Sequence, residues 1–473
     1  MNKQYLTTSV WLIALLTVSL HTPATAAPGW TAPAAVGTMT LFNLPTNNAS
    51  VAVAANGDAT AVWINESNYV VQYAQRKAGV WSAAKSLYTP SATKNETTSS
   101  AHVVLRNDGS AGAVFASTTP GALQYCVSGG RVVRCLGPSK SFAKFATLAV
   151  GGTSWTKTNL SAQGILIDDT QIAVDATGNL LASWRYLPSA GQPTHLQVTS
   201  QAMGGVWSAV QSIASSSNPI SLPTLSMAAS GDAVLAWQEK QTIGSNVSFA
   251  LNAVYRNSPG AWGSVENPQN LSAQTWTLRA GIDGNGIATL VWDNNYSIQL
   301  SRRDNANSAS PWTTPVTLAS AAGTQYGYAG PFAAYSPVVA VSSGGDVLVS
   351  WLESEVSTGL WQIEAQILAA NGTVQSAASW PVDPQTGTSI PSATFSADGT
   401  VAAVGWIDNG TSSANVASFT TTGGWGLPSA IGSGLWGGTV AIGSGPNTNV
   451  SAIWWTNTTT EFKYKFTASS YQP

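Results

Sequence analysis

Charged side chains are scarce in this sequence: Asp, Glu, Lys and Arg make up 8% of the 473 residues, and the formal net charge is −2. Nucleic acids and anionic membranes are bound by dense clusters of cations, so this composition argues against both as partners. The sequence also lacks a long helical periodicity and, after its first residues, any apolar run long enough to span a membrane. We therefore expect no nucleic-acid partner and no membrane span.

The sequence also lacks the motifs of several kinds of metal, cofactor and catalytic site. Beyond the leader described below, only His102 and His195 remain, and they fall in different repeats, so they cannot share a zinc site. No glycine-rich phosphate loop precedes a helix and no DxDxDG calcium loop occurs, since Asp283-Gly284-Asn285-Gly286 is better explained as a hairpin turn. We expect neither a metal nor a cofactor, and a Ser-His-Asp triad could arise only by coincidence.

The first 26 residues have the features of a secretory signal peptide. Lys3 is positive, an apolar stretch runs from about Val10 to Leu20, and Ala24-Thr25-Ala26 matches the small-x-small cleavage pattern. No cysteine lies at the cleavage position, which argues against a lipid anchor. We predict a protein secreted to the periplasm or outside the cell, and the short positive region favours a bacterial source.

Cys126 and Cys135, the two cysteines of this chain, are predicted to form a disulfide. The segment between them is typical of a hairpin with a two-residue turn at Gly130-Arg131, which would put the cysteines directly opposite one another. A redox-active pair is the alternative, but the spacing is not that of a CxxC motif.

Glycine and proline are abundant, with 44 and 23 residues, and they mark the turns of a repeat. The unit is a strand, a tight turn and a second strand whose aromatic residue lies six positions after the turn glycine, as in Gly57 to Trp63. Six copies keep this spacing, and two looser copies follow, Gly399 to Trp406 and Gly445 to Trp454. The fixed position of the aromatic residue in each copy predicts a core side chain. The eight aromatics are Trp63, Phe115, Trp184, Trp237, Trp292, Trp351, Trp406 and Trp454.

A second hairpin follows each aromatic residue and often ends in Gly-x-Trp, as at Trp81 and Trp207. Four antiparallel strands in about 50 residues make one blade of a β-propeller. We therefore predict an all-β fold, a single β-propeller of eight four-stranded blades over residues 27–473, with seven blades as the alternative if blade two or eight is degenerate. The blades are expected near residues 44–90, 100–160, 168–215, 221–268, 274–320, 335–382, 390–432 and 437–473.

The last repeat lacks its fourth strand, and a Gly-x-Trp-like ending occurs instead at the other end of the mature chain, within residues 28–36. A strand from this segment would complete the last blade, close the ring and remove a free sheet edge. Blade two is irregular because it carries Phe115 and both cysteines. Its extra length predicts an insertion around Gly137 to Ile167.

One face of such a ring holds the loops from strand two to strand three, those from strand four to the next strand one, and the channel mouth. Acids end several second strands and aromatics occur in the loops that enter first strands, a composition typical of glycan binding. For any one residue, the alternative is a solvated acid or an aromatic that covers a blade edge. The ligand-binding candidates are Trp276, Trp436, Tyr326, Tyr328, Glu239, Glu353 and Asp408.

These repeats resemble those of secreted bacterial propellers of the sialidase-like, BNR-repeat kind. Asp175-Ala176-Thr177-Gly178 and Asp283-Gly284-Asn285-Gly286 approximate the Asp box of that family, although the tryptophan follows the glycine by six residues here instead of three. The family's sialidases bind the substrate carboxylate with three arginines, whereas only Arg185 and Arg279 could reach the candidate face. The resemblance therefore does not extend to sialidase activity. The arginines expected at the opposite face are Arg76, Arg106, Arg256, Arg302 and Arg303.

Three functional hypotheses follow. The first is a secreted, monomeric, non-enzymatic binding module that recognises glycan or protein through one propeller face. The second is a glycan-cleaving hydrolase that uses acids of that face, and the third is a scaffold without a small ligand. Few charges and abundant polar and aromatic loop residues favour the first. Two acids about 5–10 Å apart in a concave pocket would favour the second.

Overall fold

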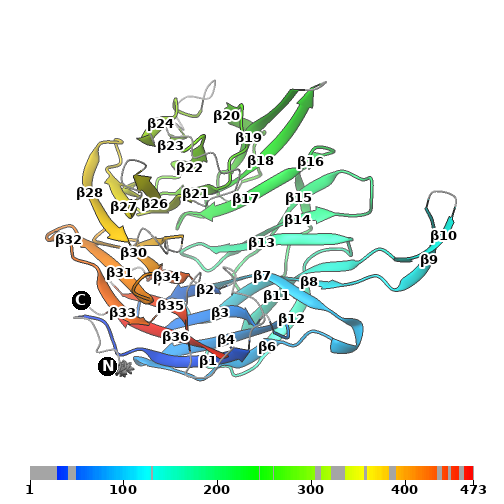
Figure 1. Cartoon of the computed structure of the whole chain (residues 1–473), viewed down its shortest axis with the longest axis horizontal. Helices are drawn as coiled ribbons and strands as arrows, with labels where there is room; N and C mark the ends of the chain where they lie inside the picture. The colour runs from blue at the N-terminus through cyan, green and yellow to red at the C-terminus, as the bar shows by residue number, and fades with distance from the viewer. Residues whose placement is uncertain are drawn as a thin grey trace, which may run out of the picture.

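A computed structural model of the chain describes residues 29–40, 49–65, 67–128, 131–243, 246–258, 260–303, 311–320, 336–355, 360–382, 390–433, 439–445, 449–457 and 463–471. The predicted signal peptide, Tyr326, Tyr328 and Trp436 lie outside these ranges. Eight small antiparallel sheets form a ring, which confirms the predicted eight-bladed β-propeller (Figure 1). Within the described ranges the only helical element is the 3-10 turn η1 (Ala92–Lys94), and no helix there could cross a membrane.

Each of the first four blades follows the chain order of its strands from the centre of the ring outward. Blade one is β2 (Ala49–Val53), β3 (Ala59–Asn65), β4 (Val70–Lys77), β5 (Val80–Trp81) and β6 (Lys85–Tyr88); blade two is β7 (Thr97–Leu105), β8 (Ala111–Thr119), β11 (Lys140–Leu148) and β12 (Trp155–Asn159); blade three is β13 (Leu166–Val174), β14 (Leu180–Leu187), β15 (Thr194–Gln201) and β16 (Gln211–Ser216); blade four is β17 (Ile220–Met227), β18 (Ala233–Ile243), β19 (Asn246–Arg256) and β20 (Glu266–Leu271).

The other four blades have the same order, and the last one takes its outer strand from the N-terminal side of the chain. Blade five is β21 (Leu278–Ile282), β22 (Ala288–Asn294), β23 (Ser297–Arg302) and β24 (Val316–Ser320); blade six is β25 (Val338–Val341), β26 (Val347–Glu355), β27 (Leu360–Leu368) and β28 (Val374–Val382); blade seven is β29 (Ser392–Phe395), β30 (Val401–Asp408), β31 (Ser413–Thr420), β32 (Gly424–Trp425) and β33 (Ser429–Ser433); blade eight is β34 (Val440–Ser444), β35 (Val450–Asn457), β36 (Lys463–Tyr471) and β1 (Ala34–Thr40).

The innermost strands form a closed circle around the ring axis. Going round, β2 contacts β7, which contacts β13, and the series continues through β17, β21, β25, β29 and β34 back to β2. Each inner strand therefore touches one neighbour on either side. Two inner-strand side chains that are not on neighbouring blades can meet only across the channel.

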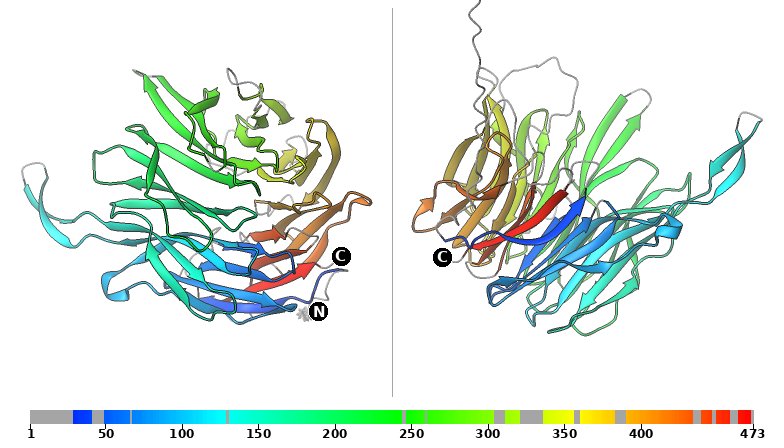
Figure 2. Two further views of the ribbon diagram at one scale, coloured as in Figure 1. Left: turned by 180° about the vertical axis from the view of Figure 1, so that it is seen from behind. Right: turned by 60° about the horizontal axis from the view of Figure 1, so that its bottom comes forward.

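The ring closes as the circular offset of the repeat predicts. β1 pairs antiparallel with β36, so the first and last described strands lie side by side (Figure 2). Trp30 bridges Tyr471, its ring lies 5.7 Å from the Tyr471 ring, and its side chain is 5% exposed. Trp30 thus takes the position of the Gly-x-Trp ending of the other repeats, which confirms the predicted closing strand.

The eight repeat aromatics are all buried, with exposed fractions of 0–2%. They lie within the second strands of the blades. Each second strand lies between two other strands of its own blade and between two neighbouring blades, and every residue of β3 is buried. In blades one and three the indole donates to a glutamine directly across the sheet, Trp63 to Gln72 at 3.0 Å and Trp184 to Gln197 at 2.9 Å. These glutamines are not part of the repeat pattern that the sequence shows.

The turns between first and second strands are held by a polar residue at their start. Asp175 Oδ1 accepts hydrogen bonds from the backbone of Thr177 and Asn179, and Asp283 Oδ1 does the same for Asn285 and Ile287. Gly178 has φ +84°, a conformation that a side chain would disfavour. The segment from Asp283 to Gly286 is therefore a hairpin turn, as the sequence predicted.

The insertion in blade two was misplaced by the sequence analysis. The region from Gly137 to Ile167 contains β11 and β12, the regular third and fourth strands of the blade. The extra element is the hairpin of β9 (Leu123–Ser128) and β10 (Arg131–Leu136), inserted between the second and third strands and projecting away from the ring (Figures 1 and 2). The inserted segment therefore lies earlier in the chain than expected, at the hairpin that carries both cysteines.

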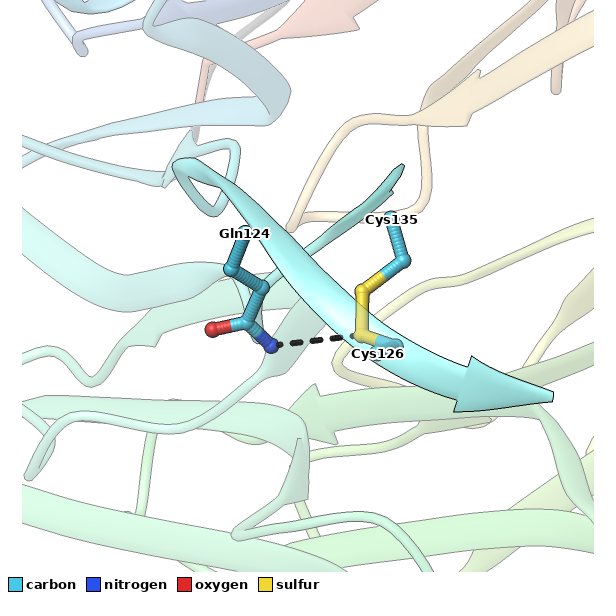
Figure 3. Close-up of a disulfide and its surroundings, with 3 residues drawn as sticks. All are labelled: Gln124, Cys126 and Cys135. Carbon is cyan, nitrogen blue, oxygen red and sulfur yellow. Dashed lines mark hydrogen bonds between the residues drawn. A yellow bond between two sulfur atoms is a disulfide. The ribbon is translucent and has the colours of Figure 1, made fainter. Parts of the chain in front are cut away.

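Cys126 and Cys135 form the predicted disulfide across this hairpin (Figure 3). The register differs from the prediction, because Ser128 pairs with Arg131 and the cysteines are therefore diagonal neighbours instead of direct partners. Cys126 lies opposite Val133, and its Cα is 5.9 Å from that of Cys135. The predicted turn at Gly130-Arg131 is thus shifted by one residue.

We expect replacement of both cysteines by serine to leave the ring intact and to loosen only this hairpin. An isolated two-stranded hairpin is marginally stable in water, whereas the blade beneath it has its own four strands. Trypsin should then cleave at Arg131 and Arg134 faster than in the unchanged protein, while the thermal midpoint moves by less than about 2 °C. Mass spectrometry of timed digests and calorimetry measure the two effects. A large fall in the midpoint would contradict this assignment.

Candidate functional site

The loops that connect second to third strands and fourth to first strands bring one exposed tryptophan to the channel mouth. Trp276, predicted as a ligand-binding residue, lies just before the inner strand β21, and its side chain is 61% exposed. The backbone N–H groups of Trp276 and Thr277 donate to the carboxylate of Asp293, at 3.1 and 2.6 Å, and the Thr275 hydroxyl donates at 2.8 Å. Burial raises the pKa of Asp293. A buried carboxylate thus fixes the loop while the indole remains open to solvent.

Glu239, another residue predicted from the sequence to bind a ligand, lies on β18, the second strand of blade four. Its carboxylate accepts hydrogen bonds from the Ser216 hydroxyl and from the side-chain amides of Asn218 and Asn252. Gln238, the preceding residue, lies 3.5 Å from the carbonyl of Thr275, the residue before Trp276. Blades four and five are therefore joined next to both predicted residues, and Glu239 presents a polar cluster near the Trp276 loop.

Glu353 and Asp408 do not join this group. Glu353 accepts a hydrogen bond from the Trp351 indole at 3.0 Å in blade six. Burial, and to a smaller extent the charge of Glu353, raises the pKa of Glu364. Asp408 accepts a backbone hydrogen bond from Gly410 at 2.9 Å and stabilises the turn between β30 and β31. Both carboxylates thus have local structural partners on separate blades.

A compact acidic cluster lies instead on the inner strand of blade three. Arg185 holds both oxygens of Asp168, at 2.7 and 2.6 Å, lies 3.2 Å from Asp169, and donates to the carbonyl of Ile220 on blade four. Burial, and secondarily the charge of Asp168, raises the pKa of Asp169. Titratable groups shifted in this way concentrate at functional sites, although ion-pair networks shift them too.

Three successive inner strands carry a bulge in this region. The pairing slips between Ser99 and His102 in blade two, between Asp168 and Gln171 in blade three, and between Ser221 and Thr224 in blade four. In each bulge one residue has a positive φ: Ser100 (+53°), Asp169 (+50°) and Leu222 (+52°). Such conformations cost about 1–3 kcal/mol each and cluster at ligand sites.

Side chains next to these bulges hold neighbouring blades together. The Thr170 hydroxyl donates to the carbonyl of Ser100, and the Gln171 amide donates to that of Pro223. The backbone N–H of Ala280 in blade five donates to the Thr224 hydroxyl at 3.2 Å. The wall of the channel is therefore fixed from blade two to blade five.

His102 and Arg279 project into the channel from inner strands that are not neighbours. Both side chains are exposed to solvent, and β7 and β21 contact different inner strands. Desolvation, and secondarily the charge of Arg279, lowers the pKa of His102 to about 4. Desolvation also lowers the pKa of Arg279. Neighbouring protein atoms therefore desolvate both groups although each side chain is exposed.

This shift predicts a pH dependence of stability. His102 has a folded pKa of about 4, against an ordinary value of 6.5, so between these values the unfolded chain binds a proton that the folded chain does not. The free energy of unfolding should therefore fall as pH decreases from 6.5 towards 4. His102→Gln should make the decrease shallower, which urea unfolding at several pH values would measure. Parallel curves for the two proteins would contradict the assignment.

The opposite face carries the arginines that the sequence placed there, bonded to turns between first and second strands. Arg106 donates to the carbonyl of Gly178 at 2.8 Å and Arg256 to that of Gly231 at 3.0 Å. A cleft of about 430 Å³ opens on this face between blades five and six. Its charges are satisfied internally, because Arg302 lies 3.7 Å from Asp283 and Arg303 lies 2.8 Å from Glu266. The channel mouth is therefore the better candidate site.

Two residues predicted from the sequence, Trp276 and Glu239, thus lie near each other, whereas Asp293, Asp169 and His102 were not among the predicted ligand-binding residues. For Asp293 the sequence does contain a signal, because an acid directly after a core tryptophan, as in Trp292-Asp293, lies near the end of a buried strand.

Among the described residues no group of three or more His, Cys, Asp or Glu side chains is placed to hold a metal ion.

No protein-family model matches the sequence, and no curated protein matches it. Among solved structures, the chain is similar to an α-L-arabinanase of Penicillium chrysogenum in complex with arabinobiose, with 11% identity, 72% of this chain and 99% of that chain covered, and a TM-score of 0.41. It is also similar to an ulvan lyase of family PL25 (9% identity, 80% and 92% covered, TM-score 0.48) and to a protein of unknown function from Dyadobacter fermentans (11%, 94% and 100%, 0.39). Likenesses at this level carry no information on ligand or chemistry.

Proposed function

We propose that this protein is a glycan-binding module that uses the channel mouth around Trp276 and does not cleave its ligand. The observation that carries the proposal is the exposed indole of Trp276 on a loop fixed by Asp293. An aromatic face packs on the C–H groups of a sugar ring, and a preformed loop loses little entropy on binding. The amides and hydroxyl around Glu239 supply polar groups nearby.

The predicted acids favour binding over hydrolysis. A glycosidase needs two carboxyl groups that flank one bond, about 5–10 Å apart. Glu239, Glu353 and Asp408 lie on blades four, six and seven, and each has structural hydrogen bonds. A non-enzymatic role is the simpler interpretation of this arrangement.

The test is a glycan-array screen with the mature protein and its Trp276→Ala variant. We expect saturable binding to a subset of glycans and a loss of at least tenfold in affinity in the variant, because the stacking surface is removed. Trp425→Phe is a control for general effects of losing an indole, since Trp425 lies in the outer part of blade seven. Absence of binding across the array, or unchanged binding by Trp276→Ala, would overturn the proposal.

Asp169 favours a second candidate, a glycan hydrolase with this residue as general acid. Its pKa is raised, it lies at the channel mouth beside Asp168, and its backbone is in a strained conformation. Release of reducing sugar from array-positive glycans, abolished by Asp169→Asn with binding retained, would establish hydrolysis. Turnover that persists in Asp169→Asn would eliminate this role.

Export of the chain, a monomeric state, the expected blade boundaries and the kinship with sialidase-like BNR propellers remain predictions. The disulfide supports export, because such bridges persist in oxidising compartments. Fractionation of the native host would test export, and light scattering would test the monomeric state.

A further inference from the structure

Arg279 stands out at the channel mouth as a cation with unused hydrogen-bonding capacity. A guanidinium has five N–H donors, and here one nitrogen donates to the carbonyl of Leu278 at 3.0 Å. In the described parts of the chain, no carboxylate lies within ion-pair distance of Arg279. Its side chain is open to solvent from the inner strand β21.

The nearest acidic influence on Arg279 does not neutralise it directly. Desolvation lowers the pKa of Arg279, and the charge of Asp293 offsets this only in part. The Asp293 carboxylate already accepts hydrogen bonds from Thr275, Trp276 and Thr277. The exposed guanidinium of Arg279 therefore keeps N–H donors that an anion entering the mouth could use.

The group across the channel does not compete for such an anion. His102 has a pKa of about 4, so near neutral pH its imidazole carries no charge and can donate or accept a hydrogen bond. The nearby Asp168 carboxylate is held by Arg185 through two hydrogen bonds. Arg279 is therefore a cation that remains available to a ligand at this mouth.

We propose that Arg279 binds a carboxylate of an acidic glycan whose neighbouring sugar packs on Trp276. This inference rests on the proposed function and specifies its ligand as a uronic-acid-containing chain. One planar guanidinium with a single charge matches one planar carboxylate through two parallel hydrogen bonds. Trp276 and Arg279 are three residues apart, about 10 Å along an extended backbone, so the ligand would span more than one sugar ring.

The first test compares oligogalacturonate, its neutral methyl ester and a sulfated galactan by calorimetry. We expect the mature protein to bind the acid at least tenfold tighter than the ester and the sulfated chain. Arg279→Gln should bind acid and ester equally, at the affinity that the unchanged protein shows for the ester, and Arg279→Lys should keep part of the preference. Equal affinities for acid and ester in the unchanged protein, or a preference that survives in Arg279→Gln, would overturn the inference.

A second measurement locates the carboxylate. Because the charge of Arg279 lowers the pKa of His102, a carboxylate bound to Arg279 should raise it. We expect ¹⁵N-histidine NMR titrations to show this rise with oligogalacturonate and not with the ester. They should also show a higher His102 pKa in ligand-free Arg279→Gln. An unchanged His102 titration in the presence of bound acid would place the carboxylate elsewhere.

The outcomes separate this inference from the proposed function. Binding of neutral glycans that depends on Trp276, without a preference for acids, would leave the binding module standing and remove the role of Arg279. Binding of neither acidic nor neutral chains would overturn both.

Discussion

Trp292→Ala should lower the free energy of unfolding by about 3–5 kcal/mol. The Trp292 side chain is fully buried and packs with residues of two blades, including Ala236 and Leu251 of blade four and Leu290 of blade five. Truncation removes a large apolar surface and leaves a cavity between the blades that a closed ring cannot easily collapse. Urea unfolding followed by circular dichroism, with the slope checked for a single transition, measures the change.

Two variants of the same blade control this experiment. Trp276→Ala makes the same chemical change at a side chain that is 61% exposed, so stability should change by less than about 1 kcal/mol. Trp292→Phe should be tolerated far better than alanine, because the buried Trp292 indole nitrogen has no hydrogen-bond partner and Phe115 occupies the equivalent position in blade two. Equal destabilisation by Trp276→Ala and Trp292→Ala would contradict the assignment of the repeat aromatics to the core.

Removal of residues 29–40 should have a larger effect still, because it opens the ring. The deletion takes away the ladder between β1 and β36 and the buried side chains of Trp30 and Val36, which are 5% and 2% exposed. We expect a loss of more than about 5 kcal/mol and association through the exposed edge of β36. Calorimetry and size-exclusion chromatography measure the two consequences.

A chain that begins at Gly29 is the matched control for this deletion and should keep the stability of the mature protein. Adding a peptide of residues 29–40 in excess should raise the thermal midpoint of the truncated chain, since a ligand that binds only the folded state stabilises it. A truncated chain as stable as the control, or one that the peptide does not affect, would show that this strand does not close the ring.

The fold was predictable because one short pattern recurs along the chain. A glycine at the tight turn and an aromatic residue six positions later mark the first hairpin of a blade, and the missing fourth strand of the last repeat predicted closure by the segment around Trp30. These inferences depend on the spacing of residues within each repeat and on the order of the repeats, and the structure confirms them. The hairpin of Cys126 and Cys135 shows where such reasoning is weaker. A shift of the strand register by one residue cannot be recognised from the residue composition, yet it changes every cross-strand pair.

The candidate site was predictable only in part. Trp276 and Glu239 were identified because loops on one face of a propeller converge at the channel mouth. Glu353 and Asp408 looked equivalent in sequence, yet they have local structural partners on other blades. The predicted residues Tyr326, Tyr328 and Trp436 lie outside the described ranges and remain predictions.

The sequence alone determined that this chain forms a closed ring of four-stranded blades, which aromatics lie between them, and which two cysteines pair. These properties follow from patterns within about 50 residues and from the burial that those patterns require. Only the tertiary structure decided that His102 and Arg279 influence one another and that Asp293 fixes the loop of Trp276. The interaction of His102 with Arg279 joins two inner strands that are not neighbours, so it depends on the curvature of the closed ring, which no local pattern encodes.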